Sequence, residues 1–335
     1  MCDGRSAGLD YRQLSPMKTG GPPPIIDEDS FLRLFEEIGP TKLAVRIGSS
    51  IRAVYSRRER IEKRRNRQIT GPDHRLATRH NISHPGRLTH DVKNGVVLVG
   101  SDCHYWPGAA STGHRAFVKY CRDLRPSVVV LNGDVIDAAT ISRHPPIGWE
   151  RRPSVQEEIE AAQDRLNEIE LAAGKARKIW TLGNHDGRFE TRLATVAPEY
   201  ARVHGVHLSD HFPNWEPCWS VWINDDVVIK HRFKGGIHAP WNNTMWAGKT
   251  MVTGHLHSAK VTPLTDYNGT RYGVDTGCIA DPSHRAFLDY TEDSPKNWRS
   301  AFCVLTFRDG TLLWPELASV FDQNSVQFRG SIISV

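Results

Sequence analysis

The sequence predicts an α/β fold preceded by a small, basic helical module. From residue 95 onward, short apolar runs alternate with amphipathic segments in the order strand, helix, strand, helix, strand. That order is typical of parallel strands joined by right-handed helical crossovers. Between residues 42 and 67, ten Lys or Arg residues face only two Glu residues, a surplus larger than the net charge of +5 of the whole chain. This charge distribution indicates a basic patch attached to a near-neutral domain.

The composition is that of an ordinary globular protein. Of the 335 residues, 39% are hydrophobic and 24% are charged, and this length suffices for one large domain and a small one. No apolar run approaches the ~18 residues that span a bilayer, and the first residues lack the apolar core of a signal peptide. The six cysteines are scattered, without a C-x-x-C pair. We therefore expect a cytoplasmic protein with free thiols and no membrane partner.

Glycine and proline clusters and the predicted helix boundaries divide the chain into four regions. Gly and Pro clusters end in GGPPP at residues 20–24, which indicates a flexible start. Apolar residues recur at helical spacing over 29–38, and Gly39-Pro40 would end that helix. A second helix is expected over 41–47 and a third after Ser49 or Ser50. The predicted regions are a lead-in over 1–26, a basic module over 27–70, a linker over 71–93 and the main domain over 94–335.

Residues 41–58, TKLAVRIGSSIRAVYSRR, resemble a helix-turn-helix. In that resemblance Ala44 packs between the helices, Gly48 makes the turn and Val54 fills the core, with further core contacts from Ile47 and Ile51. Four arginines would then face outward toward DNA phosphates: Arg52, Arg57, Arg58 and Arg60. A helical bundle without a DNA role is the alternative.

The main domain is predicted element by element. The first three strands are expected over 95–100, 127–131 and 178–182, with helices over 114–124 and 155–176 between them. After residue 200 the apolar runs shorten, and a hairpin is expected from 219–223 and 227–230 around an Asn-Asp-Asp turn. Further short strands are expected over 250–253, 260–264, 272–275, 302–307 and 312–314. The second half should therefore be more antiparallel than the first.

Polar clusters follow the ends of these strands. They are Asp102 and His104; Asp134 and Asp137; Asn184, His185 and Asp186; His231; and His255 and His257. Ligands of open α/β sheets bind at the carboxyl ends of strands, and carboxylate, amide and imidazole donors suit Mn, Fe or Zn. A glycine precedes four of the clusters, at Gly100, Gly133, Gly183 and Gly254, and we expect it to allow a tight turn. Each cluster alone is ordinary turn chemistry, but their joint occurrence at strand ends is improbable by chance.

The order DCH, GDVID, GNHD, a lone histidine and GHLH resembles the calcineurin-like metallophosphoesterase superfamily. The motif set of that superfamily is D-x-H, G-D-x-x-D, G-N-H-[DE], H and G-H-x-H, and the resemblance covers about residues 95–310. It implies a four-layer α/β/β/α sandwich around two divalent metal ions. Manganese is the expected metal, with iron, zinc or nickel as alternatives.

The resemblance also implies a role for each matching residue. The first metal would be held by Asp102, His104, Asp134 and His257, and the second by Asp134 as a bridge together with Asn184, His231 and His255. A hydroxide between the metals would attack phosphorus. His185 would be the general acid for the leaving alkoxide, oriented by Asp137, with Asp186 as a second candidate for that task.

Three assignments stay open at this point. His238, seven residues after His231, competes for the place of the lone ligand. Arg188, just after GNHD, would either contact the substrate phosphate or form a surface ion pair. Cys103, between Asp102 and His104, is either a ligand or a buried neighbour.

Two differences from the motifs of protein Ser/Thr phosphatases limit the class of substrate that we expect. Ala138-Ala139 follows GDVID where protein Ser/Thr phosphatases carry Arg-Gly, and GNHD replaces their GNHE. The pattern is more similar to nucleases and small phosphodiesterases. We therefore expect hydrolysis of phosphodiesters, in DNA if the basic module delivers substrate. The alternatives are a small-molecule phosphodiesterase or phosphatase with a regulatory basic module, and a DNA-binding protein with a non-catalytic metal site. The oligomeric state is left open.

Overall fold

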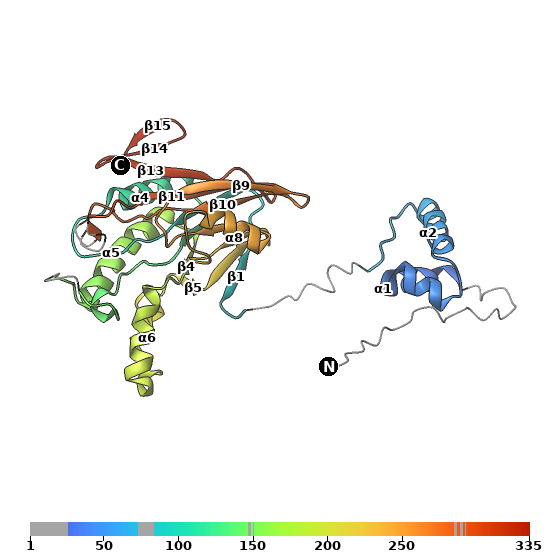
Figure 1. Cartoon of the computed structure of the whole chain (residues 1–335), viewed down its shortest axis with the longest axis horizontal. Helices are drawn as coiled ribbons and strands as arrows, with labels where there is room; N and C mark the ends of the chain where they lie inside the picture. The colour runs from blue at the N-terminus through green and yellow to red at the C-terminus, as the bar shows by residue number, and fades with distance from the viewer. Residues whose placement is uncertain are drawn as a thin grey trace, which may run out of the picture. The chain divides into compact units, whose positions relative to one another are not determined.

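The computed structural model describes residues 26–72, 84–146, 149, 151–284, 287–288, 291 and 293–335. The chain divides into two compact units, residues 1–82 and residues 83–335, which Figure 1 shows in blue and in cyan to red. The expected lead-in over 1–26 lies outside the described residues except for Ile26, and so do residues 73–83 of the expected linker. None of the described helices is long and apolar enough to cross a membrane.

The first unit is built from helices α1 (Glu28–Arg46) and α2 (Ile51–Arg65). Asp27 and Ser50 cap their N-termini by accepting a backbone N–H through their side chains, as capping residues do. Gly39, with φ 77° and ψ 169°, breaks the helical path of α1 before Pro40. The break expected at Gly39-Pro40 is therefore present, and α1 consists of two helical stretches.

A small apolar core holds α1 and α2 together. Phe31, Phe35, Leu43, Ala44, Val54 and Ile61 are its main buried members. Ala44 and Val54 are buried as expected, and Gly48 has a φ of +62° in the turn between the helices. The expectation for Ile51 is wrong: this residue occupies the first position of α2, beyond the buried stretch, and its surface is 45% exposed.

Two of the four arginines do not face outward as expected. The Arg57 guanidinium lies 4.5 Å from the centre of the Phe31 ring and donates to the Ile26 carbonyl. Arg58 lies over Tyr55 at 5.3 Å and pairs with Glu62 at 3.3 Å. Their aliphatic stems therefore cover the small core, as long cationic side chains often do. Arg52 and Arg60 are exposed.

The second unit contains a nine-stranded sheet whose centre is parallel. Strands β2 (Gly95–Gly100), β3 (Val128–Leu131) and β4 (Arg177–Thr181) run parallel in that order, as the sequence predicts. β5 (Glu216–Cys218) extends this side in parallel. On the other side the antiparallel strands are β11 (Ala301–Arg308), β13 (Glu316–Asp322), β14 (Ser325–Phe328) and β15 (Ser331–Ser334), and β12 (Thr311–Leu312) pairs with β11.

The second sheet has six strands in the order β1-β6-β7-β8-β10-β9. Their bounds are β1 Arg87–His90, β6 Ser220–Ile223, β7 Val227–Ile229, β8 Thr250–Thr253, β9 Lys260–Asp266 and β10 Gly269–Asp275. The expected hairpin is present as the antiparallel pair β6–β7. The linker expected over 71–93 is corrected, because its residues 87–90 form β1 and pair in parallel with β6. The four residues RLTH contain one aliphatic side chain, too few for a strand pattern.

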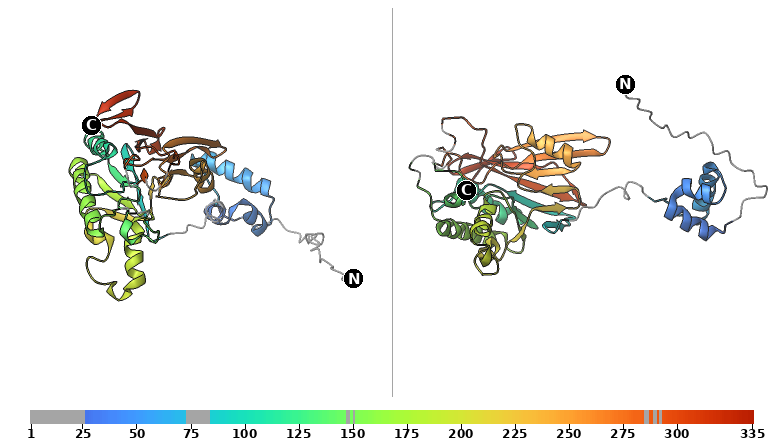
Figure 2. Two further views of the ribbon diagram at one scale, coloured as in Figure 1. Left: turned by 60° about the vertical axis from the view of Figure 1, so that its left-hand side comes forward. Right: turned by 60° about the horizontal axis from the view of Figure 1, so that its bottom comes forward.

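Successive side chains of a strand point to opposite faces of its sheet, and this alternation shows which layer covers each face. In β2, Val97 and Val99 belong to the apolar cluster between the two sheets, whereas Leu98 faces the cluster under the helices. Helices α4 (Thr112–Leu124) and α5 (Val155–Ala173) cover that outer face. On the second sheet, Gly273 lies directly under Pro240 of α8 (Ala239–Ala247), while its neighbour Val274 points to the cluster between the sheets. The result is the expected four-layer α/β/β/α sandwich (Figures 1 and 2).

The remaining helices are short or follow directly from a strand end. α6 (Asp186–Val196) starts within GNHD, and α7 spans Leu208–His211. Two 3-10 turns span Ala139–Ile141 and Pro198–Tyr200. The sequence pattern predicts neither α6 nor α8, because their apolar residues do not form a regular helical stripe.

Candidate metal centre

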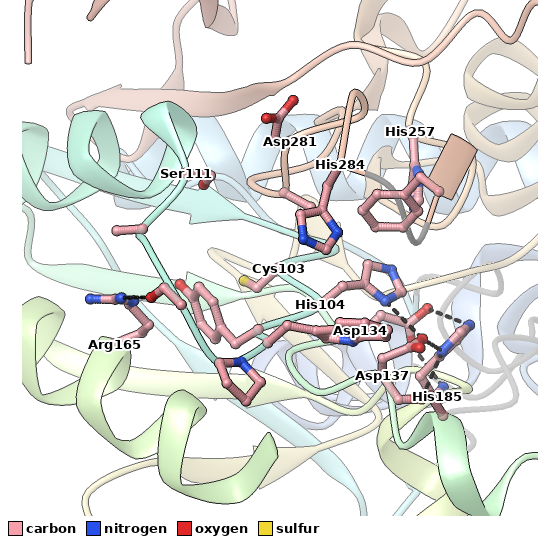
Figure 3. A pocket seen from close by; sticks show the side chains of 18 of the residues that line it. Cys103, His104, Ser111, Asp134, Asp137, Arg165, His185, His257, Asp281 and His284 are labelled. Atoms are coloured by element: carbon pink, nitrogen blue, oxygen red, sulfur yellow. Dashed lines mark hydrogen bonds and ion pairs between the residues drawn. The ribbon is translucent and has the colours of Figure 1, made fainter. Parts of the chain in front are cut away.

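The polar clusters of the sequence come together at one edge of the sandwich, where strands of both sheets end. Asp102 and His104 follow β2, and Asp134 follows β3. Asn184 follows β4, while His231, His255 and His257 follow strands β7 and β8 of the other sheet. Figure 3 shows His104, Asp134, Asp137, His185 and His257 around one pocket.

Three groups of side chains in the described part of the chain have the spacing of a metal site. They are Asp102, His104 and His257; Asp134, His231 and His255; and His104, Asp137 and His185, each with ligand atoms within 4.8 Å of one another. The first two groups contain six of the seven ligands expected from the sequence. The seventh is Asn184, whose Oδ1 lies 3.2 Å from His231 Nε2.

The environment of His231 is that of a metal-binding histidine. Its Nδ1 donates to the Asn132 carbonyl at 2.8 Å, which leaves Nε2 to face Asp134 Oδ2 at 3.0 Å. A ring whose second nitrogen is held by a carbonyl in this way is oriented for metal binding through the first. His238 lies in an exposed segment before α8 and belongs to none of the three groups. The geometry therefore favours His231 as the lone ligand.

Histidine side chains surround the two buried carboxylates of the centre, Asp102 and Asp134. Asp102 Oδ1 lies 3.0 Å from His257 Nε2, and Asp102 Oδ2 accepts the His255 backbone N–H at 2.9 Å. Burial raises the pKa of Asp102, but the positive charges of His257 and His231 outweigh it and lower this pKa to about 2. The pKa of Asp134 is likewise lowered, against its burial, by His231 and His185. The centre therefore holds two ionised carboxylates in a buried place that favours cations.

The residues present fit a pair of divalent metal ions. His104 Nε2 and His257 Nδ1 are buried and have no hydrogen-bond partner among the described residues. Buried polar atoms are nearly always paired in folded proteins, so these two nitrogens indicate partners from outside the chain. The donor set of carboxylate oxygens, an amide oxygen and imidazole nitrogens suits Mn, Fe or Zn.

His185 stands beside this donor set and is held by Asp137. Its Nδ1 lies 2.5 Å from Asp137 Oδ1, and its backbone N–H donates to Asp134 Oδ1 at 2.8 Å. Burial lowers the pKa of His185, but the hydrogen bond that its ring donates to Asp137 and the negative charge of Asp134 outweigh it, so the pKa is raised. Arg188 donates to the Asp137 carbonyl at 2.9 Å and lies 3.2 Å from His185 Nε2. Its guanidinium also lies 3.9 Å from Asp137 Oδ1, so the ion pair that Arg188 forms is part of the site and not of the open surface.

Asp186 is not beside the His185 ring, which corrects its place as a second candidate for orienting that histidine. Its carboxylate is fully buried and accepts the backbone N–H groups of Asp134, Val135 and Gly183. It also accepts from the indole of Trp180 at 2.9 Å. Asp186 therefore fixes the loop that carries Asp134.

Glu158, a buried carboxylate on α5, was not among the residues expected from the sequence. It accepts the backbone N–H groups of Asp137, Ala138 and Ala139 at 3.1, 2.5 and 3.0 Å. The sequence did contain a signal for its burial, because the spacing of Ala162, Leu166 and Ile169 assigns position 158 to the buried face of that helix. A carboxylate at a core position of an amphipathic helix requires such donors.

The backbone of the centre carries another feature that the sequence did not reveal. Five of the seven candidate ligands have a left-handed backbone, with φ between 41° and 72°: Asp102, His104, Asp134, His255 and His257. Such conformations are costly for residues with a side chain and cluster at functional sites. Here they turn successive side chains toward the same point.

A cavity of about 980 Å³ opens beside the centre. His104, Asp134, Asn184, His185, Arg188, His255 and His257 line it, together with the aromatic residues Trp106, Phe287 and Trp298. Cys103 also borders the cavity, but burial raises the pKa of its thiol well above the usual range, and it belongs to none of the ligand groups. It is a buried neighbour.

The fold and the donor set define a metal-dependent phosphoester hydrolase. A sequence model of the family described as calcineurin-like phosphoesterase matches residues 95–270, more than half of the chain, and the chain belongs to that family. Members of this family typically use two metal ions. No curated protein matches the sequence.

Several solved structures resemble the chain at low sequence identity. The phosphoesterase Yfce from E. coli is 14% identical with a TM-score of 0.31, over 71% of this chain and 97% of that one. A dimetal phosphatase from Danio rerio is 10% identical with a TM-score of 0.35, over 73% and 99%. Vps29 from Chaetomium thermophilum is 10% identical with a TM-score of 0.35, over 72% and 95%.

Proposed function

We propose that this protein is a two-metal phosphodiesterase that cleaves phosphodiester bonds in DNA. The observation that carries the proposal is the Asp137–His185 pair, which lines the cavity of about 980 Å³ beside the candidate ligands. Such a pair protonates a leaving alkoxide, the poor leaving group of a nucleic-acid diester. The buried Ala138 and Ala139, in place of the arginine of protein phosphatases, argue against a phosphoprotein substrate.

In this proposal the metals are held as the motif order implies. Asp102, His104, Asp134 and His257 would hold the first ion; Asp134, Asn184, His231 and His255 would hold the second. When bound, two divalent ions polarise the phosphoryl oxygens and make a nucleophile available at neutral pH. We propose manganese as the working metal, with iron, zinc or nickel as alternatives that share this ligand preference.

The protein's own groups would perform the remaining steps. Asp137 accepts the Nδ1–H of His185 and fixes the ring, and the raised pKa of His185 favours the imidazolium, which carries a second proton on Nε2. The opposite nitrogen, Nε2, lies 3.8 Å from Asp134 Oδ2 and beside Arg188, on the side where the phosphate would bind. His185 would deliver a proton from Nε2 to the leaving oxygen, and Arg188 would contact a phosphoryl oxygen.

The basic module over 27–70 would bring the enzyme to DNA, separated by a linker from the main domain. Arg52 and Arg60 are exposed and suited to contact phosphates. Arg57 and Arg58 pack on the core of the module instead. The Arg52→Gln/Arg60→Gln variant should weaken duplex binding and leave hydrolysis of small diesters unchanged, as measured by fluorescence anisotropy and by nitrophenolate release. Unchanged duplex binding would remove the DNA role of the module.

The direct test compares bis-(p-nitrophenyl) phosphate, p-nitrophenyl phosphate and labelled single- and double-stranded DNA, each with added Mn²⁺. We expect the diester and at least one DNA form to be cleaved, and Asp134→Ala to abolish both reactions. Hydrolysis of the monoester alone would contradict a phosphodiesterase.

A small-molecule phosphodiesterase is the second candidate, and the size of the cavity favours it. About 980 Å³ is the upper end of the range for small-molecule sites. Turnover of the nitrophenyl diester without cleavage of either DNA form would establish this alternative.

A further inference from the structure

A long stretch of the sequence around the second group of ligands contains no acidic residue. From Val227 to Thr265 there is no Asp or Glu, while Lys230, Arg232, Lys234, Lys249 and Lys260 are basic. The chain as a whole has 38 acidic residues in 335, so about four would be expected in 39 residues at the average frequency. The stretch therefore carries a local positive charge on a nearly balanced domain.

The structure exposes much of this stretch as one surface. Residues 232–238, between β7 and α8, are all exposed. On α8, the residues Ala239, Pro240, Asn243 and Thr244 are buried, whereas Trp241, Met245 and Trp246 are 40%, 43% and 67% exposed. Single exposed aromatic side chains are ordinary, but a contiguous exposed patch of them often marks a binding site. We call Lys230, Arg232, Phe233, Lys234, Trp241 and Trp246 the 230–246 surface.

Cations and aromatic rings alternate on this surface. Lys234 Nζ lies 4.4 Å from the Trp246 ring centre and 5.6 Å from that of Phe233, and Lys230 Nζ lies 5.5 Å from Phe233. Within the described part of the chain, none of Lys230, Arg232 and Lys234 has a carboxylate within ion-pair distance. Lys230 is half-buried, whereas Arg232 and Lys234 are exposed, and their charges are available to an anionic ligand.

The exposed segment is fixed to the sandwich at both ends. The Lys234 backbone N–H donates to Asn243 Oδ1 at 2.8 Å, and Lys260 Nζ donates to the Ile237 carbonyl at 3.1 Å. At its start, the segment leaves the metal centre directly, because His231 lies between Lys230 and Arg232 and the Gly254 N–H donates to the His231 carbonyl at 2.9 Å. A ligand on the 230–246 surface would thus lie next to the centre.

We propose that the 230–246 surface binds single-stranded nucleic acid and leads the strand to the metal centre. The inference rests on the proposed phosphodiesterase function and specifies its substrate. Exposed lysine and arginine side chains contact phosphates, and exposed tryptophan and phenylalanine rings stack on unpaired bases. An acidic peptide would use the same cations but gains little from the rings, and a duplex hides the base faces.

The test measures how a fluorescein-labelled oligothymidylate of 20 nucleotides and a matched duplex bind to the full chain. Binding is followed by fluorescence anisotropy in the presence of EDTA at several salt concentrations. The variants are Trp246→Ala and Lys234→Gln. The matched controls are Tyr267→Ala, an exposed aromatic residue on the β9–β10 turn, and Lys175→Gln, an exposed lysine between α5 and β4. Hydrolysis of bis-(p-nitrophenyl) phosphate with Mn²⁺ is measured in parallel for every variant.

We expect Trp246→Ala to weaken single-strand binding by roughly 5- to 100-fold, the range for loss of one stacked base. Lys234→Gln should reduce the slope of log affinity against log salt by about 0.7, the value for one lost phosphate contact. The two controls should match the unaltered protein, and hydrolysis of the small diester should be the same in all five proteins.

Three results would overturn the inference while leaving the phosphodiesterase intact, provided that the small diester is still hydrolysed. These are unchanged single-strand binding in both surface variants, equal losses in the controls, and displacement of the oligonucleotide by poly-glutamate at equal charge concentration. A protein that fails to hydrolyse the small diester with any divalent metal would instead overturn the proposed function itself.

Discussion

At the scale of single residues, the glycines of the motifs are required by lack of space more than by backbone freedom. A Cβ at Gly183 would overlap the Asp134 side chain, and one at Gly254 would overlap Ser101 and Asp102. Neither of these glycines has a positive φ, whereas Gly133 does, at +82°, and there a Cβ would also meet the His231 ring. The tight turn expected from the sequence is therefore only part of the reason, and close packing of the candidate ligands is the rest.

This packing predicts that Gly254→Ala displaces Asp102. The variant should lose most hydrolysis of bis-(p-nitrophenyl) phosphate and about 1–3 kcal/mol of unfolding free energy, the usual cost of overpacking. Gly187→Ala is the control, because a Cβ there meets nothing within 4 Å. Activity and urea unfolding of both variants measure the effect, and equal behaviour of the two would contradict it.

The His185–Asp137 pair predicts a dependence on the leaving group. His185→Ala should lower the rate for a dinucleotide by ~10²–10⁴-fold, because its alkoxide needs a proton to leave. The loss should be smaller for bis-(p-nitrophenyl) phosphate, whose nitrophenolate leaves without one. His238→Ala, outside the ligand groups, should keep its activity on the nitrophenyl diester. Equal losses for both substrates would show that His185 is not the general acid.

At the scale of elements, two buried carboxylates hold successive parts of the loop after β3. Asp186, at the start of α6, binds the backbone of Asp134 and Val135, while Glu158 of α5 binds that of residues 137–139. The loop carries both Asp134 and Asp137, so α5 and α6 position the candidate bridging ligand and the partner of His185. Helices that look like simple covering layers thus set the geometry of the site.

Glu158 predicts a specific pH dependence of stability. Burial raises its pKa from 4.5 to about 7, against the backbone N–H groups that bind it. Because the folded state then binds the proton more tightly than the unfolded state, the contribution of Glu158 to stability is full below pH 4.5 and is lost as pH rises through 7. The loss amounts to about 3 kcal/mol.

Glu158→Gln does not titrate and should lack this component. The difference in unfolding free energy between the variant and the unaltered protein, measured by urea between pH 4 and 8, should change in favour of the variant as pH rises. If the unfolding free energies of the two proteins changed with pH in the same way, Glu158 would not be a group with a raised pKa.

At the scale of the whole molecule, the centre exists only when both sheets are packed together. Asp102, Asp134 and Asn184 come from one sheet, and His231, His255 and His257 from the other. A metal that joins these residues binds the folded chain and not the unfolded one, so it stabilises the fold. The metal centre and the sandwich therefore depend on each other.

Removal of metal should accordingly lower the melting temperature. In a protein stripped with EDTA, Mn²⁺ at about 100 times its dissociation constant should add roughly 3 kcal/mol of stability. Asp134→Ala should abolish this response, while Asp210→Ala, at a carboxylate outside the ligand groups, should retain it. Differential scanning fluorimetry measures both, and a metal response preserved in Asp134→Ala would exclude Asp134 as a ligand.

The sequence by itself determined the three central parallel strands, the β6–β7 hairpin and the family, whereas the parallel pairing of β7 with β8 and of β8 with β10 came only from the structure. Apolar runs such as 95–100 report burial directly, and the motifs are local in the chain. Only the tertiary structure showed His231, and not His238, beside Asp134 and His255, Asp186 bound to the backbone of Asp134, and Arg57 packed on the ring of Phe31. It also revealed β1 and Glu158, whose roles depend on partners distant in the sequence. Such roles are set by which surfaces pack together, and no local pattern of side chains encodes that.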